Sequence, residues 1–115
     1  MRVPQESSEI LANAMSVDAF KQTKSVLNDD GVVGWSVFDS EGAEITSDGV
    51  SDRVTAVTSN ILDLATQIGE QLGETDARPS VSFSKAALEM YSVAVEDVNL
   101  LVVRDKSGGF RKEFN

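Results

Sequence analysis

The most regular pattern of apolar and polar positions in this chain runs from Asp52 to Gly73. Apolar residues recur there at gaps of three and four, and at about 100° per residue they fall on one side of a helix. Ser51 or Asp52 can accept a hydrogen bond from a free backbone N–H at the start, and Gly73 can adopt the left-handed conformation that ends a helix. We therefore predict a helix whose apolar side packs on the chain's own sheet. The apolar positions are Val54, Val57, Ile61, Leu64, Ala65, Ile68 and Leu72.

The other side of this predicted helix carries mostly small residues. Periodicity alone allows two interpretations of it. A polar side is ordinarily solvated, but a flank without bulky side chains also lets a second helix approach closely. The pattern by itself does not choose between them. The residues are Ala56, Ser59, Asn60, Asp63, Thr66 and Gly69.

The segment before the first strand predicts one or two helices. Residues 1–8 are polar, and we expect them to be loose. Apolar positions between Glu9 and Leu27 fit a single helix, but Ser16 can also cap a second helix from Val17 to Asn28. We favour the split at Ser16, followed by a turn that ends at Gly31.

Five segments have the composition of β-strands. Val32–Phe38 is apolar on both alternating faces, so it is predicted as a central strand with Trp35 in the core. A turn at residues 39–42 leads to a second strand, Ala43–Ser47, and forms a hairpin. Pro79–Ser84 alternates serine with apolar residues, and its proline cannot donate to a ladder, which indicates a strand at a sheet edge. The remaining strands are Leu88–Val95 and Val98–Arg104.

The order of these elements predicts an α+β fold, in which a five-stranded antiparallel sheet is covered by helices on both faces. We expect residues 1–15 to form a partly helical N-terminal extension and residues 16–115 to form the domain. The tail from Asp105 to Asn115 contains two adjacent glycines and allows at most a short helical turn around Phe110 and Phe114.

Composition narrows the class of protein. The 115 residues suit one domain, and 41% hydrophobic residues are enough for a core. The formal charge of −9 disfavours nucleic acid and anionic membranes as partners, because both would be repelled. The sequence contains no apolar run long enough to insert in a membrane and no signal peptide at its start, so we expect a soluble, cytoplasmic protein.

Candidate catalytic and metal-binding residues are few. The chain has no histidine and no cysteine, so serine or threonine lacks its usual activating base and a thiolate metal site is excluded. The acidic turn after Asp39 resembles a calcium loop only superficially, because Glu44 and Val50 stand where that loop needs glycine and glutamate. Gly31, Gly34 and the later glycine pair match no nucleotide-binding pattern, and Gly34 instead indicates close packing against the strand. We predict no catalytic site, no metal and no cofactor.

The segment from Gly31 to Arg104 resembles the roadblock/dynein light chain family. The likeness lies in the order and spacing of several short motifs and of the long helix between them. They are Gly31-Val32-Val33-Gly34 at the start of a strand, the hairpin Phe38-Asp39-Ser40-Glu41-Gly42, Ile45-Thr46-Ser47, the helix from Asp52 to Leu72, and Asn99-Leu100-Leu101-Val102-Val103.

This resemblance implies a dimer, either of identical chains or with a related roadblock protein. In the family the long middle helices lie antiparallel across the dimer axis, and the third strands pair so that two sheets become one. The resemblance therefore favours the second interpretation of the small-residue flank. Under it the dimer interface falls on Thr55, Ser59, Leu62, Asp63, Thr66, Gly69, Val81 and Phe83.

The resemblance also implies a function. Family members bind and regulate small Ras-like GTPases, or serve as adaptors in dynein-type and kinase signalling assemblies, and they bind no nucleotide themselves. We expect a non-catalytic GTPase regulator, with the adaptor as the alternative; the sequence assigns no residues to partner binding. The chain departs from the family in its short tail and in Lys85-Ala86-Ala87, where relatives often have glycine. We hypothesise that residues 9–15 cover the sheet surface that a full C-terminal helix would protect.

Overall fold

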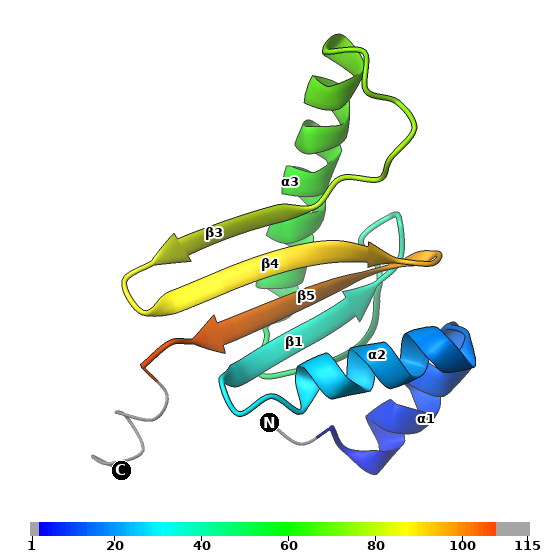
Figure 1. Cartoon of the computed structure of the whole chain (residues 1–115), viewed down its shortest axis with the longest axis vertical. Coiled ribbons are helices and arrows are strands. Elements are labelled where there is room, and N and C mark those ends of the chain that lie inside the picture. Colours follow the sequence, from blue (N-terminus) through cyan, green and yellow to red (C-terminus); the bar gives the residue numbers. More distant parts are fainter. Residues whose placement is uncertain (1–2, 108–115) are drawn as a thin grey trace.

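The computed structural model describes residues 3–107, which form a single antiparallel sheet between two helical layers (Figure 1). The sheet has the strand order β2-β1-β5-β4-β3. Helices α1 and α2 lie on one face, and α3 lies on the other. The predicted α+β fold with five strands is therefore confirmed. The elements are α1 (Gln5–Ala14), α2 (Val17–Leu27), β1 (Val32–Phe38), β2 (Glu44–Asp48), α3 (Asp52–Gln71), β3 (Val81–Lys85), β4 (Leu88–Val95) and β5 (Val98–Asp105).

Local caps set the ends of the helices largely as predicted. The Ser16 hydroxyl accepts a hydrogen bond from the Ala19 N–H and separates α2 from α1, which confirms the split. The Ser51 hydroxyl accepts from the Val54 N–H at the start of α3. Gly73 follows the last turn of α3 with a φ of 83°, as the sequence predicted.

The prediction that residues 1–8 are loose is wrong for the described part of that segment, because α1 begins at Gln5. Its N-cap is Pro4, which offers no side-chain hydrogen bond, so the local sequence gives little sign of a helix start. Tertiary packing supplies the missing stability: Leu11 is fully buried, and the Ser7 hydroxyl accepts a hydrogen bond from Thr46 of β2 at 3.1 Å. The side chains of Val3 and Leu11 join the core beneath α2, so α1 packs as part of that helical layer.

The larger core lies between the α1–α2 layer and the sheet. Trp35 and Val37 of β1 are fully buried there and pack beside Leu100 and Val102 of β5. The prediction that Trp35 is a core residue is confirmed. The strand bounds agree within two residues, with β3 starting at Val81, after the proline, and the prediction for Phe110 and Phe114 lies outside the described residues.

The prediction that the apolar stripe of α3 packs on its own sheet is wrong for most of the stripe. Val54 is partly buried against the sheet core, but Val57, Leu64, Ile68 and Leu72 are exposed. The side chains that α3 buries there are mostly small and hydroxylated, namely Thr55, Thr58, Ser59 and Leu62. Thr55 donates a hydrogen bond to the Ser36 hydroxyl of β1 at 2.9 Å, and Thr58 donates to the Val54 carbonyl of its own helix at 2.8 Å. These hydrogen bonds satisfy buried hydroxyls, so small polar residues can fill the contact and bring the helix close to the sheet.

Two glycines permit close approaches on this face. A Cβ on Gly34 would lie 2.8 Å from the Gly49 carbonyl oxygen, because the connection from β2 to α3 crosses β1 at this point. The close packing predicted at Gly34 is therefore made by this connection. Gly42, with a φ of 88°, completes the β1–β2 turn, and a Cβ there would lie 2.7 Å from the Ser59 hydroxyl.

The hydroxyl pair under α3 makes a testable contribution to stability. Thr55→Val removes the donor to Ser36 and is expected to lower the free energy of unfolding by about 1–2 kcal/mol, because a buried hydroxyl loses its partner. The double variant Ser36→Ala/Thr55→Val removes both polar groups and is expected to lose less than the sum of the two single changes. Urea unfolding at one fixed protein concentration measures this coupling. Strictly additive effects would contradict a direct hydrogen bond.

The β3–β4 turn carries strain that substitution can relieve. Ala86 has a φ of 54°, in the left-handed region where a Cβ is unfavourable. Ala86→Gly is expected to raise the free energy of unfolding by about 1 kcal/mol, after allowing for the greater freedom of glycine in the unfolded chain. Ala87→Gly is the matched control, since Ala87 does not have a positive φ and glycine there brings only the entropic loss. Equal effects of the two changes in urea unfolding would refute the strain.

Candidate interaction surface

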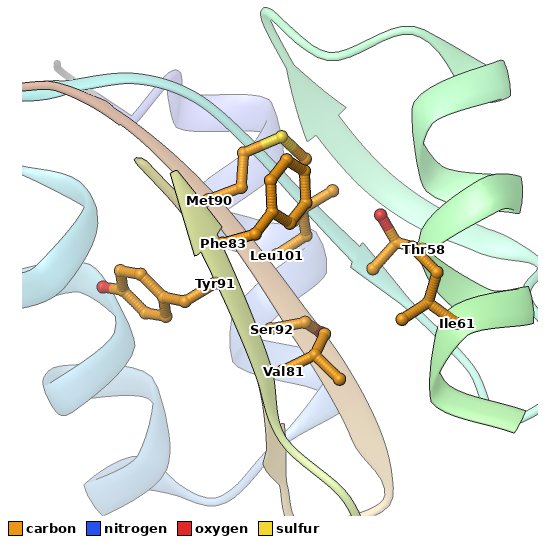
Figure 2. Close-up of a pocket in the computed structure, with 8 residues that line it drawn as sticks. All are labelled: Thr58, Ile61, Val81, Phe83, Met90, Tyr91, Ser92 and Leu101. Carbon is orange, nitrogen blue, oxygen red and sulfur yellow. The ribbon is translucent and has the colours of Figure 1, made fainter. Parts of the chain in front are cut away.

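An apolar trough lies between α3 and the β3–β4 edge of the sheet, with an open cavity of ≈ 250 Å³. We call it the α3–β3 trough. Val54, Val57 and Ile61 of α3 form its wall, and Phe83 of β3 and Met90 of β4 form its floor. In Figure 2, Phe83, Met90 and Val81 project from the sheet toward α3, whereas Tyr91 projects toward the opposite helical layer. The trough thus lies on the α3 face and faces the free edge of the sheet.

The periods of the two elements explain this surface. Alternate residues of a strand face the same side, so Val81 and Phe83 both point to the α3 face, and Phe83 stands opposite Met90 in the antiparallel pair. On α3, Ile61 precedes the buried Leu62 by one residue and is turned about 100° around the helix from it. The first part of the apolar stripe, Val54, Val57 and Ile61, consequently faces sideways over β3 and β4 instead of down onto the sheet.

The second half of α3 projects beyond the sheet. Leu62 is the last residue of α3 that is buried among the described residues, and Figure 1 shows the helix continuing past β3. Three large side chains beyond this point are exposed, with 57% of Leu64, 60% of Ile68 and 76% of Leu72 accessible to solvent. A few turns of helix with no packed face gain little from propensity alone. The exposed apolar half is therefore a candidate interaction surface.

The neighbouring strand also has an unpaired side. β3 lies at the edge of the sheet and, among residues 3–107, pairs only with β4, so within that range the backbone groups on its outer side have no sheet partner. Phe83 is 52% exposed despite its size. An edge strand next to an apolar trough is suited to pairing with another chain.

Contact between α3 and its sheet is thin near the trough. The only large apolar side chain of α3 in the buried class is Leu62, which packs with Phe38 and Leu101, and Val54 is partly buried beside them. The Ser92 hydroxyl is buried without a hydrogen-bond partner beside a small cavity of ≈ 10 Å³, about the space of one water molecule. The α3 face of the sheet therefore has the smaller of the two apolar cores.

The loop that joins α3 to β3 is fastened to the β4–β5 turn. The Arg78 guanidinium donates to the Glu96 carbonyl, to the Val98 carbonyl at 2.8 Å and to the Asn99 side chain at 3.0 Å. On the other side of this turn, the Ser16 N–H donates to the Glu96 carboxylate at 2.6 Å, which lowers the pKa of that carboxyl. The turn therefore ties both helical layers to one end of the sheet and fixes where β3 begins.

The residues predicted for the dimer interface fall into three groups in the structure. Thr55, Ser59 and Leu62 are buried against the chain's own sheet, so their side chains are not free for a partner. Asp63 and Thr66 are exposed beside Arg78 and Pro79, and Gly69 lies close to the Glu74 carbonyl. Val81 and Phe83 lie on the trough side of β3. The structure brings only this last pair together with the apolar stripe.

Sequence reasoning missed Val57, Leu64 and Ile68 as exposed residues because it assigned the apolar stripe to the interior. A second helical period was present at 55, 58, 59 and 62, and it marks the buried line. Threonine and serine hydroxyls in that line can bond locally, so they are compatible with burial. Hydrophobicity alone does not predict that this side of α3 is the buried one.

Other kinds of site find little support in the described structure. Within residues 3–107, no group of three His, Cys, Asp or Glu side chains is placed to hold a metal ion. None of the helices in that range combines the length and the apolar character that a membrane span requires.

Comparison with known proteins identifies the architecture. No family model matches the sequence, and no curated protein matches it. A roadblock/LC7 domain from Streptomyces avermitilis superposes with a TM-score of 0.59 at 14% identity, over 66% of this chain and 68% of that one. MglB of Myxococcus xanthus gives a TM-score of 0.64 at 14% identity, over 98% and 86% of the two chains.

A third similar structure is the gliding protein MglB from Thermus thermophilus. It has a TM-score of 0.63 at 15% identity and covers 96% of this chain and 88% of its own. The resemblance found in the sequence is thereby confirmed at the level of the fold: this chain has the roadblock fold.

Proposed function

We propose that this chain is a non-catalytic, dimeric roadblock-type protein of the cytoplasm that binds and regulates a small Ras-like GTPase. The observation that carries the proposal is the α3–β3 trough together with the half of α3 that projects past the sheet. GTPase regulation is the role that the resemblance to roadblock proteins implies, and the roadblock fold of the chain supports it.

A second copy of the chain suits the trough. A twofold axis beside β3 would place the projecting half of each α3 in the trough of the other copy, so that the same contact forms twice. The 20 residues of α3 span about 30 Å, long enough to lie on both sheets. The outer edges of the two β3 strands would pair at the same axis. All three exposed features are then covered by one arrangement.

The proposed interface differs from the one predicted from the sequence. Val81 and Phe83 remain, whereas Thr55, Ser59 and Leu62 are replaced by Ile61, Ile68 and Met90. The new residues are apolar and lie in the trough or on the projecting half of α3. Their burial would supply the stability that the thin contact between α3 and its own sheet lacks.

Arg78 and Arg104 both have partners within the chain, which agrees with a regulator that supplies no catalytic group. An arginine supplied to a GTPase must be free to reach the transferred phosphate. Arg78 is engaged by the β4–β5 turn, and Arg104 lies 3.7 Å from a carboxylate oxygen of Asp29 and 3.9 Å from one of Glu89. We infer that regulation acts by ordering or shifting the switch segments of the GTPase.

The dimer is tested with Phe83→Asp. Phe83 is half-exposed in one chain, so the change is expected to spare the fold but to place a charge in the interface. Loss of about 2 kcal/mol at such a residue weakens association roughly 30-fold. Light scattering is expected to give a dimer mass for the natural chain and a lower mass for the variant. Val17→Asp, on the opposite helical layer and also exposed, is the control that should stay dimeric. A strict monomer of the natural chain at high micromolar concentration would rule out the dimer.

GTPase binding is tested with the Ras-like GTPases encoded by the same genome. Each is mixed with the natural chain in its GDP and GTP forms, and co-elution and hydrolysis rate are measured. We expect one of them to form a stable complex and to change its rate of hydrolysis or nucleotide release. Absence of a complex with every member of the panel would refute the GTPase role and leave a structural adaptor role.

A further inference from the structure

The α3–β3 trough continues inward to a narrow space under α3. The small cavity of ≈ 10 Å³ beside Ser92 is lined by four of the same side chains as the trough, so the two form one space with a wide outer part and a narrow inner end. Figure 2 shows these side chains between the sheet and α3. We call the whole space the Ser92 pocket. The shared side chains are Thr58, Ile61, Phe83 and Met90.

The inner end of the pocket carries a buried hydroxyl that no group within residues 3–107 satisfies. Ser92 is 0% exposed, and its hydroxyl has no hydrogen-bond partner in that range. It stands two residues after Met90 on β4, so its side chain points to the same α3 face of the sheet. A buried hydroxyl without a partner costs free energy, so this site favours a molecule that brings a hydrogen-bonding atom to it.

The Thr58 hydroxyl, on the opposite wall of the inner end, restricts the chemistry of that atom. Thr58 donates its proton to the Val54 carbonyl at 2.8 Å, so its oxygen can only accept a hydrogen bond from a ligand. Ser92 still has a proton to donate. A ligand hydroxyl can accept from Ser92 and donate to Thr58, whereas an ether or a ketone can only accept. The inner space is about that of one water molecule, which a terminal hydroxyl can replace while keeping its hydrogen bonds.

The rest of the pocket suits an uncharged aliphatic chain. No charged side chain among residues 3–107 lines the inner end, so a carboxylate or an ammonium group there would lose its hydration without gaining a partner. The outer part has a volume of ≈ 250 Å³ and is walled by aliphatic side chains of α3, Phe83 and Met90. Within the described range, the one charged side chain that lines it is Arg53, which is exposed. The pocket therefore combines a hydroxyl-sized polar end with an apolar outer part.

We infer that the Ser92 pocket binds a neutral, medium-chain aliphatic alcohol. Its hydroxyl lies between Ser92 and Thr58, and its chain lies along Ile61, Phe83 and Met90. Such a ligand fills the trough in which the proposed function seats a second copy of the chain. Ligand and second copy therefore compete, and the alcohol shifts the chain from dimer to monomer. The ligand site needs only one chain, but its effect on the dimer rests on the proposed function.

Titration with n-octanol tests the site. Binding is followed by NMR through the side-chain methyl group of Met90, at a low protein concentration. Ser92→Ala is expected to weaken binding about 10-fold, because the ligand hydroxyl loses its donor. This variant should fold, since the hydroxyl that it removes has no partner within residues 3–107. Ser84→Ala, the same change at an exposed serine on the other face of β3, is the matched control and should bind like the natural chain.

Sodium octanoate tests the orientation of the ligand. It has the same chain length but a charged head, and it is expected to bind more weakly than n-octanol because its carboxylate cannot be buried beside Ser92. Tighter binding of octanoate that is lost in Arg53→Gln would overturn the inference, since the head group would then lie at the exposed end. Equal n-octanol affinities of the natural chain and Ser92→Ala would also overturn it, as would an unchanged Met90 signal at saturating n-octanol.

Light scattering separates the ligand site from the dimer. We expect n-octanol to lower the dimer mass of the natural chain, and its apparent affinity to fall as the protein concentration rises, because a second copy competes for the same trough. An unchanged dimer mass at saturating n-octanol would overturn the competition. A natural chain that is monomeric without the alcohol would overturn the proposed dimer, whereas the NMR titration would still decide the ligand site.

Discussion

The hydrogen bond from Thr55 to Ser36 fixes which side of α3 faces the sheet, and the exposure of the large aliphatic side chains of α3 follows from that orientation. Both hydroxyls are buried and satisfied by each other, so a line of small residues can face β1 and β5. The helix then turns its large aliphatic side chains sideways and outward. If α3 were rotated to bury Val57 and Leu64, these hydroxyls would lose their partners and the bulkier residues would have to fit between helix and sheet.

The two faces of the sheet are stabilised in different ways. Beneath α1 and α2 the core is large, apolar and anchored by Trp35, with α1 adding Leu11. Beneath α3 it is small, partly hydroxylated and limited to the first half of the helix. The α1–α2 side therefore has the more extensive apolar core within one chain. The α3 side leaves apolar surface exposed, which a partner of suitable shape would cover.

The position of α3 in the fold brings its exposed apolar side next to the free edge of the sheet. α3 crosses the sheet and passes beyond its β3 edge (Figure 1). The side of α3 that lines the trough therefore lies near the free edge of β3. Hydrogen bonds from Arg78 to Val98 and Asn99 at the start of β5 hold the loop that joins α3 to β3. A second copy of the chain seated in the trough, as proposed above, would contact α3 from the β3 side.

Local sequence determined the elements of this protein and most of their ends. Serine caps at Ser16 and Ser51, the glycine after α3 and the alternation in the strands were readable because each acts within a few residues. The start of α1 was not readable, because its stability comes from contacts made by Leu11 and Ser7 with distant parts of the chain. The roadblock resemblance was readable because it lies in the order and spacing of short motifs.

Only the tertiary structure decided which side of α3 is inside. The helix has two periodic lines, one of aliphatic residues and one of threonine, serine and Leu62, and hydrophobicity favours burying the first. The Ser36 hydroxyl on β1 accepts the hydrogen bond that allows the Thr55 hydroxyl to be buried. The sequence does not show that these two side chains will meet. Sites that depend on that rotation, including Phe83 with Ile61 and the outward Leu64, became visible only once helix and sheet were placed together.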